Sequence, residues 1–336
     1  MELTAGTVEM IVCAILIFVS IIGNAVLICC TWRCVRRRLP TSFVLIFSLA
    51  VVHLARNFVV NVMNIALDAE VVLESPSCKV GRFTAALTTT LAVWFTLYLS
   101  IFYCAKLYRV VHPLSTDPKK KWRRHHLFTV LFLWIAGIAI YCPVLVFGEK
   151  DTHVMAENGT QYQYSSLLYT ECLVNYSSQQ LALFYGKIFL VIVDLLPLAG
   201  LVLVSFRVAF LLWEHKKATY GDIWIGSDAT EDEIIRASKV VIVMMFLATS
   251  LWISHFILVH FLQDLSSYYF MPAVLAVLCS GYSAISPYLL LLINYKLKVQ
   301  LRSLKPFCCP DVKKSIPTDV KKSVSESAPA VASPYA

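Results

Sequence analysis

The second long apolar run of this 336-residue chain contains polar side chains at a regular spacing. His53, Asn57, Asn61 and Asn64 recur at i, i+4, i+8 and i+11, which places them on one face of a helix, and Arg56 lies beside that face. Inside a membrane such side chains have to face the interior of a helix bundle and find partners there. We expect the deeper His53, Arg56 and Asn57 to form a structural network or a conformational lock. Asn64, the outermost, is expected to contact a ligand.

The fifth apolar run adds two opposite charges, Lys187 and Asp194. They lie two turns apart on one helix face, about 10 Å along the axis, which is too far for a direct ion pair. Asp194 is the only acid deep inside an apolar run, and it either has a functional role or pairs with Arg56, His255 or a hydroxyl group. Lys187 either extends to the membrane interface or faces a ligand.

The sequence contains no arrangement typical of catalysis or of metal binding. Asp194 has no paired carboxylate, no Ser/His/Asp set converges, and the eleven cysteines show no Cys-x-x-Cys or Cys/His metal spacing. We therefore expect neither an enzyme nor a bound cofactor or metal. Asn24, in the middle of the first apolar run, is interpreted as a hydrogen-bonding contact between helices.

The composition places these side chains inside a membrane protein. The chain is 58% hydrophobic and only 15% charged, whereas about a quarter of the residues in a soluble domain are charged. Seven apolar runs are each long enough to cross a bilayer, which predicts an all-α seven-transmembrane-helix bundle. The runs are Val8–Trp32, Ser42–Leu67, Arg82–Tyr108, His125–Phe147, Phe184–Trp213, Lys239–Leu262 and Tyr268–Ile293.

The distribution of basic residues predicts the orientation of the bundle. The first, third and fifth connections and the tail contain 22 lysines and arginines, and the opposite connections contain three. By the positive-inside rule the N-terminus lies outside and the C-terminus inside, which agrees with an odd number of spans. The net charge of +8 is therefore interpreted as attraction to anionic membrane lipid and cytosolic partners, not to nucleic acid.

Two cysteines and two glycosylation motifs fall on the predicted outer side. Cys78 and Cys172 can pair in an oxidising compartment, although two free thiols remain the alternative. Asn158 and Asn175 each begin an Asn-x-Ser/Thr tripeptide in the same outer loop as Cys172. This loop is therefore predicted to be glycosylated and tethered above the third helix.

The segment after the seventh run is predicted to leave the membrane. Residues 296–310 alternate basic and apolar side chains, which is typical of an interfacial amphipathic helix, and Cys308 and Cys309 are candidates for palmitoylation. Residues 311–336 are rich in Lys, Ser, Pro and Ala and are predicted to be a disordered cytoplasmic tail.

The third run has small residues in its outer half and aromatic and polar residues deeper in the membrane. Small side chains such as Ala85 and Thr89 allow close helix approach, and Trp94, Thr96 and Tyr98 then form the floor of a ligand cavity or serve only in packing.

Three features resemble G-protein-coupled receptors. These are Gly23-Asn24, the cysteine pair Cys78 and Cys172, and Val110-Val111-His112-Pro113-Leu114 after the third span. The chain departs from the rhodopsin-like pattern, since Ala105-Lys106-Leu107 replaces Asp-Arg-Tyr and Ser286-Pro287-Tyr288 replaces Asn-Pro-x-x-Tyr.

These departures resemble vomeronasal type-1 receptors, and in particular the fish olfactory-receptor-class-A-related group. The residues that carry this resemblance are Leu49 to Asn57, Cys78-Lys79, Cys172 and Ser286-Pro287-Tyr288. The segment from Leu99 to Leu107 is also similar to bitter taste receptors, which are the alternative. Because bitter taste receptors generally lack a cysteine before the third helix, Cys78 favours the vomeronasal interpretation.

The resemblance implies a chemosensory receptor in the plasma membrane, expected in a chemosensory neuron, with residues 1–295 as the receptor domain. It is expected to bind a small odorant or pheromone in an upper helical cavity and to activate a heterotrimeric G protein. An ion- or proton-coupled transporter would also explain the buried charges, but no internal repeat supports it.

The predicted sites are assigned as follows. The ligand cavity is formed by Asn64, Ala85, Thr89, Glu171, Lys187, His260, Tyr268 and Tyr269. The G-protein surface is formed by Lys106, Arg109, Lys119, Lys120, Lys121, Arg123 and Arg124. Lys187 favours an acidic or polar aromatic ligand, whereas Glu171 favours an amine.

Overall fold

The computed structural model describes residues 5–36, 42–69, 71, 74–112, 119–150, 172–174, 180, 184, 193, 195–221, 229–261 and 271–293. Within this part of the chain, seven helices are long and apolar enough to cross a membrane. They are α1 (Ala5–Arg36), α2 (Ser42–Asp68), α3 (Ser75–Val111), α4 (Lys119–Phe147), α7 (Leu196–Gly221), α8 (Ala229–Phe261) and α9 (Met271–Ile293). The predicted seven-transmembrane-helix bundle is confirmed.

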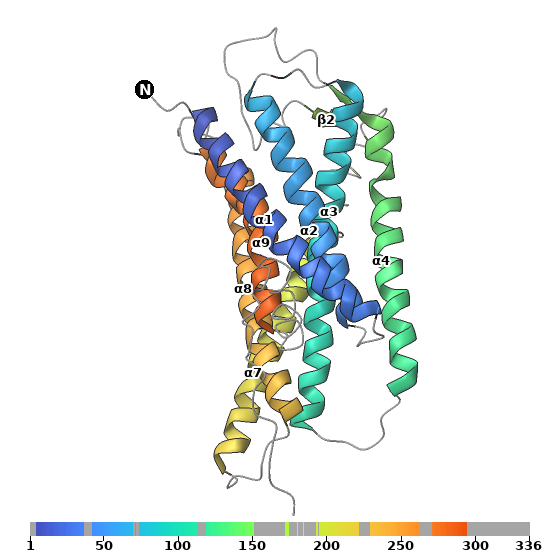
Figure 1. The fold of residues 1–336 in the computed structure, drawn as a ribbon, viewed down its shortest axis with the longest axis vertical. Helices are drawn as coiled ribbons and strands as arrows, with labels where there is room; N and C mark the ends of the chain where they lie inside the picture. The colour runs from blue at the N-terminus through green and yellow to red at the C-terminus, as the bar shows by residue number, and fades with distance from the viewer. Residues whose placement is uncertain are drawn as a thin grey trace, which may run out of the picture.

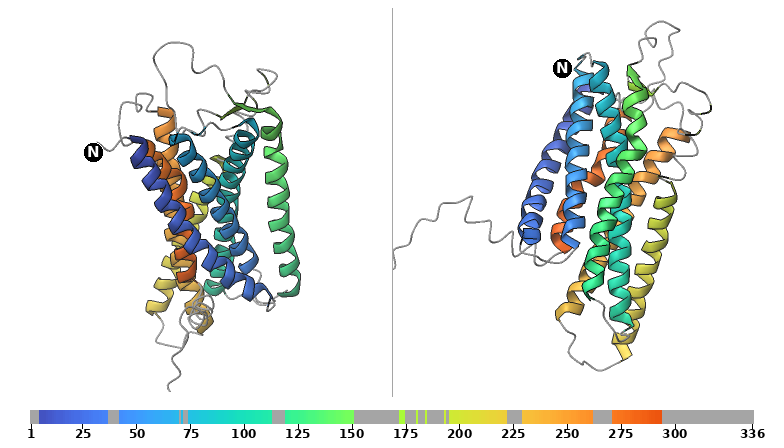
Figure 2. Two further views of the ribbon diagram at one scale, coloured as in Figure 1. Left: turned by 45° about the horizontal axis from the view of Figure 1, so that its top comes forward. Right: turned by 90° about the vertical axis from the view of Figure 1, so that its right-hand side faces the viewer.

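The helices form one elongated bundle in which α3 occupies the centre (Figure 1). α3 contacts α2, α4, α7 and α8, while α1 packs against α2 and α9. Figure 2 shows the same arrangement from two further directions, with α1 and α4 at opposite sides of α2 and α3. A helix in the position of α3 can transmit a displacement to most of its neighbours.

The two ends of the bundle differ in structure. We call the end that holds the start of α1 and the start of α3 the upper end, and the opposite end the lower end (Figure 1). At the upper end the strands β1 (Gly148–Lys150) and β2 (Cys172–Val174) form an antiparallel pair, with Lys150 opposite Cys172. Both strands contact α3. This short pair is an addition to the all-helical prediction.

Four helices begin before the apolar runs that predict them, namely α1 at Ala5, α3 at Ser75, α4 at Lys119 and α8 at Ala229. α3 starts at Ser75 instead of Arg82, and a proline in its first turn is tolerated because the first backbone N–H groups of a helix have no partner within it. Cys78 consequently lies inside α3 and not before it, and its N–H donates to the Glu74 carbonyl over 3.1 Å. α4 starts at Lys119 instead of His125, so the segment expected to be a basic loop forms its first turns. The extensions of α3 and α4 are polar, and hydropathy detects only the part of a helix that lies in hydrocarbon.

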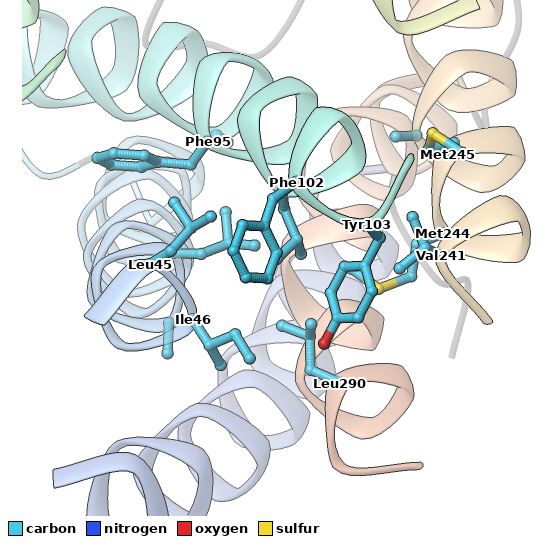
Figure 3. Close-up of a cluster of buried hydrophobic side chains, with 14 of the residues drawn as sticks. Leu45, Ile46, Phe95, Phe102, Tyr103, Val241, Met244, Met245 and Leu290 are labelled. Carbon is cyan, nitrogen blue, oxygen red and sulfur yellow. The ribbon is translucent and has the colours of Figure 1, made fainter. Parts of the chain in front are cut away.

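The apolar core of the lower half joins α2, α3, α8 and α9. Leu45 and Ile46, Phe102 and Tyr103, and Met244, Met245 and Leu290 converge there (Figure 3). Higher up, α1 approaches α9 closely at Gly23, where an added Cβ atom would lie 2.7 Å from Pro287 Cγ and 2.8 Å from a ring carbon of Tyr288. A glycine is needed here because no larger residue fits between the two helices.

Candidate functional site

Arg56 is the polar centre of the bundle. Its side chain is 2% exposed and joins α2 to three other helices. Nε donates to the Cys279 carbonyl of α9 over 3.0 Å, and Nη1 donates to the Ala85 carbonyl of α3 over 3.2 Å and to the Thr89 hydroxyl. The guanidinium also lies 5.8 Å from the centre of the Trp252 ring of α8. We call this arrangement the Arg56 junction.

Thr89 accepts a hydrogen bond from Arg56 because its own proton is used elsewhere. The Thr89 hydroxyl donates to the Ala85 carbonyl over 2.7 Å, within α3, which leaves its lone pairs for Nη1. An arginine in hydrocarbon is costly unless its donors find acceptors, and these acceptors come from two neighbouring helices. Arg56 was one of the expected partners of Asp194. In the structure its donors bind two carbonyl oxygens and one hydroxyl oxygen. Asp194 itself lies outside the described residues.

The polar face of α2 is buried, as its spacing predicts. His53, Asn57 and Asn61 are each 0% exposed, and they bond along α2 and across to α9. His53 Nδ1 pairs with the Ser286 hydroxyl, and Ser280 donates to Asn61 Oδ1 over 3.1 Å. Asn24 of α1 joins the same region, since its Nδ2 donates to the Ser283 carbonyl of α9 over 3.3 Å. The four described members of the predicted network, Asn24, His53, Arg56 and Asn57, thus tie α1, α2, α3 and α9 together.

The upper ends of α1 and α2 contain a cluster of acceptors, of which the sequence pattern indicated only Asn64. Glu9 is 2% exposed and Asn64 1% exposed, and among the residues that the structure describes Glu9 Oε1, Asn64 Oδ1 and Asp68 Oδ2 have no hydrogen-bond partner. Gly6 of α1 lies against Asp68, since a Cβ atom there would be 3.7 Å from Oδ1. Glu9 falls inside the predicted first span, Val8–Trp32. Its burial could have been predicted from that position.

The predicted ligand residues lie in two places. Ala85 and Thr89 belong to the Arg56 junction, whereas Asn64 lies about two helical turns beyond Arg56 on α2. Ala85 is 0% exposed, so its side chain serves in packing, and Thr89 is half-buried. The structure therefore brings predicted ligand residues and predicted network residues into direct contact, which the sequence pattern did not indicate.

The proposed floor residues of α3 form hydrogen bonds to residues outside α3. Trp94 Nε1 donates to the Val193 carbonyl over 2.9 Å, and the Thr96 and Tyr282 hydroxyls pair over 2.8 Å. Tyr98 pairs with His126 of α4. These contacts join α3 to Val193, α9 and α4 at a level below Thr89.

At the lower end, Lys106 lies over aromatic rings. Its Nζ is 4.4 Å from the centre of the Phe102 ring. His112, which follows α3, stacks on Tyr108 with ring centres 4.7 Å apart and lies 3.4 Å from Glu214 of α7. Arg109 is exposed. α3 therefore connects the Arg56 junction to a contact with α7 at the lower end.

Other predicted residues fall outside the structural description. Glu171, Lys187, Asp194, Tyr268, Tyr269, Asn158, Asn175, Cys308 and Cys309 lie outside the described residues, as do residues 296–336. The backbones of α4 and α8 are described at Lys119, Lys120, Lys121, Arg123, Arg124, His255 and His260, but their side chains are not.

Cys78 is disulfide-bonded. β2, which contains Cys172, contacts α3, the helix of Cys78. Pairing of Cys78 with Cys172 stays a prediction, which mass mapping of disulfide-linked peptides will check.

The seven-helix bundle with its polar interior defines a chemosensory G-protein-coupled receptor when it is taken together with the similar proteins. Residues 1–308 match the family "Taste receptor protein (TAS2R)", and the chain belongs to this family. "Taste receptor type 2 member 7" from Papio hamadryas is 26% identical over 293 residues, covering 83% of this chain and 87% of the relative. The protein of the same description from Macaca mulatta is 25% identical, covering 83% and 86%.

A fish relative matches a shorter part of the chain. "Olfactory receptor class A-like protein 4" from Danio rerio is 27% identical over 147 residues, which cover 42% of this chain and 43% of the relative. The prediction of a vomeronasal type-1 receptor is therefore corrected, and the taste receptor alternative is the one that the family supports. Cys78 favoured the vomeronasal interpretation, whereas the segment from Leu99 to Leu107 carried the resemblance to the family that residues 1–308 match.

Proposed function

We propose that this protein is a plasma-membrane receptor of chemosensory cells that binds a small bitter molecule in the upper half of the bundle and activates a heterotrimeric G protein at the lower end. The observation that carries the proposal is the direct contact between Arg56 and Thr89, because it links a predicted ligand position to the network that holds four helices together. Membership of the taste receptor family supports the same function.

The proposed orientation places the upper end outside the cell. It rests on the excess of lysine and arginine in the connections at the opposite end and in the tail. The disulfide of Cys78 at the upper end agrees with this orientation, because disulfides persist on the oxidising side of a membrane.

The proposed mechanism is a change in the hydrogen bonds of Arg56 when the ligand binds. A ligand with a polar group beside Thr89 competes for the guanidinium or adds an acceptor to it, and either event alters the spacing of α2, α3 and α9. α3 continues to Lys106 and to the His112–Glu214 contact with α7. A displacement of α3 therefore changes the lower surface, where we propose that the G protein binds, bordered by Lys106, Arg109 and the basic residues 119–124.

The proposed chemical class of the ligand rests on two charged residues of the predicted cavity, Glu171 and Lys187. We propose that Glu171, Lys187, His260, Tyr268 and Tyr269 complete the cavity. The better shielded charge is expected to be Lys187, so we favour an acidic or polar aromatic ligand whose ring stacks on tyrosine. Lys187→Gln and Glu171→Gln, compared on one agonist at matched surface expression, distinguish this ligand class from an amine. An unchanged potency in both variants would leave an apolar pocket.

Two other proposed functions, an odorant receptor and a transporter, have less support. An odorant ligand has the support of the Danio rerio relative, whose match covers less than half of the chain. A transporter would require ion flux, which reconstituted liposomes detect. We propose that the protein has no enzymatic activity.

The experiment that tests the proposal compares two neighbouring threonines of α3. An agonist is first identified by screening bitter compounds on cells that carry a promiscuous G protein. Thr89→Val removes the acceptor of Arg56, and Thr88→Val removes a hydroxyl that donates within α3 to the Thr84 carbonyl over 2.6 Å.

We expect Thr89→Val to change agonist potency about three- to twentyfold, the range for a polar contact in a membrane bundle of 0.6 to 1.7 kcal/mol. Thr88→Val is expected to stay within about twofold. Equal potencies of the two variants at equal surface expression would contradict the proposal.

A further inference from the structure

A groove between α3 and α7 lies near the lower end, away from the Arg56 junction. It has a volume of about 470 Å³, within the usual range of sites for small organic ligands. From α3 it is lined by Ile101, Cys104, Ala105, Tyr108 and Arg109, and from α7 by Leu203, Val204, Arg207 and Leu211.

The lining residues form one face of each helix. On α3 they are spaced i, i+3, i+4, i+7 and i+8, and on α7 they are spaced i, i+1, i+4 and i+8. Ile101 is 45% exposed and Leu203 70% exposed, so the groove opens away from the interior of the bundle. At the depth of a transmembrane span an exposed apolar side chain faces lipid.

Two arginines give this apolar groove a positive charge. Arg109 and Arg207 are both exposed and come from opposite walls. The Arg207 guanidinium also lies 5.7 Å from the centre of the Phe210 ring, close to the lipid-facing surface of α7. A guanidinium in this position is costly unless an anion or the interface accepts its donors. Its planar fork fits a phosphate group with two parallel hydrogen bonds.

We propose that the groove binds an anionic glycerophospholipid from the leaflet at the lower end. The phosphate lies between Arg109 and Arg207, and one acyl chain packs against Ile101, Ala105 and Leu203. The membrane that surrounds the bundle supplies this molecule at high local concentration, and its negative headgroup complements the two arginines. Ala105 keeps the groove open, because its side chain is the smallest in the lining.

A lipid fits this surface better than a polypeptide does. Leu203 and Ile101 face hydrocarbon, where a partner helix would have to be another membrane span, whereas the membrane already supplies acyl chains to this surface. A neutral lipid fills the apolar part of the groove but offers no net negative charge. Selectivity for an anionic headgroup is therefore the property that the structure assigns to this site.

Native mass spectrometry of the full-length receptor in a nonionic detergent tests the proposal. Dioleoylphosphatidylserine and dioleoylphosphatidylcholine are titrated separately, and the number of bound lipids is counted. We expect the serine lipid to bind with the higher affinity and Arg109→Gln/Arg207→Gln to lose about tenfold in that affinity. Lys216→Gln/Lys217→Gln removes two charges of α7 that do not line the groove, and we expect its affinity to equal that of the unaltered receptor.

A second variant tests the apolar half of the groove while both arginines remain. Ala105→Phe fills the space beside Ile101 and is expected to weaken binding of the serine lipid, whereas inorganic phosphate should compete poorly. Four results would overturn the proposal: equal binding of the two lipids, equal losses in the arginine and lysine variants, no loss in Ala105→Phe, or full displacement by inorganic phosphate, which would indicate a headgroup site without a chain. Thermal unfolding of each variant verifies that it is folded.

Discussion

The central helices α2 and α3 differ from the peripheral helices α4 and α7 in how much of their surface other helices cover. In an apolar 18-residue stretch of α2 and of α3, 61% and 67% of the residues are buried, against 17% in the corresponding stretches of α4 and α7. The more buried stretches are not the more apolar ones, since the mean hydropathy is 1.6 for that of α3 and 2.3 for that of α4, and 2.0 for both α2 and α7. In a membrane the lipid solvates apolar side chains, so polar contacts and close packing decide which helix occupies the centre.

The first prediction replaces an arginine by leucine, once in the centre of the bundle and once at its periphery. Arg56→Leu deletes three hydrogen bonds to two other helices, and at about 0.6 to 1.7 kcal/mol each the loss is about 2 to 5 kcal/mol. Arg207→Leu alters an exposed arginine of α7 and should cost less than about 1 kcal/mol. Thermal unfolding of the purified receptors in one detergent measures both changes. Equal losses would remove the distinction between the centre and the periphery.

The second prediction compares two glycines. Gly23→Ala places a Cβ atom 2.7 Å from Pro287 Cγ, so α1 and α9 have to separate, at a cost of about 1 to 3 kcal/mol. At Gly200 of α7 the nearest atom would be 3.5 Å away, in ordinary contact. Gly200→Ala should therefore be neutral or slightly stabilising, since alanine is the better helix former. If Gly23→Ala is as stable as Gly200→Ala, the close approach of α1 and α9 is wrong.

The third prediction concerns a single hydroxyl pair. Thr96→Val and Tyr282→Phe each break the 2.8 Å contact between α3 and α9, and a double-mutant cycle should give a coupling of about 0.6 kcal/mol. Thr129→Val provides the peripheral control, because the Thr129 hydroxyl donates within α4 to the His125 carbonyl over 2.9 Å. We expect no coupling between Thr129→Val and Tyr282→Phe. Additive losses for Thr96 and Tyr282 would show that their contact is not formed.

The smallest effect is expected where lipid covers the helix. Phe132 of α4 and Phe246 of α8 are 66% and 74% exposed, so Phe132→Leu and Phe246→Leu exchange one lipid-facing apolar side chain for another. Each should change the free energy of unfolding by less than about 0.5 kcal/mol. A loss comparable with that of Gly23→Ala would indicate a protein contact at this surface.

The sequence predicted those parts of the structure that depend on periodicity along one helix. The polar face of α2 was found from its spacing because a helix repeats every 3.6 residues, and His53, Asn57 and Asn61 are indeed buried. The extension of α3 to Ser75 was missed because its first turns are polar, and hydropathy is silent outside hydrocarbon. Hydropathy alone therefore underestimates the length of a membrane helix.

Contacts between helices were harder to predict. The sequence pattern does not predict the contact between Arg56 and Thr89, because this contact depends on the rotation of α2 relative to α3. The burial of Glu9 and the groove of α3 and α7 depend on helix neighbours in the same way. The motifs predicted a chemosensory receptor, but Cys78 favoured the vomeronasal family, whereas the segment from Leu99 to Leu107 of α3 indicated the taste receptor family to which the chain belongs.

The most direct test of the link between ligand and network is a double-mutant cycle of Arg56 and Thr89 in agonist potency. Arg56→Lys keeps the charge but loses the planar fork, and Thr89→Val removes the acceptor. Signalling of the four receptors is measured with one agonist at matched surface expression. We predict that the double variant loses no more potency than Arg56→Lys alone, because both changes break the same contact. Losses that multiply would show that the two residues act independently, and they would contradict the account.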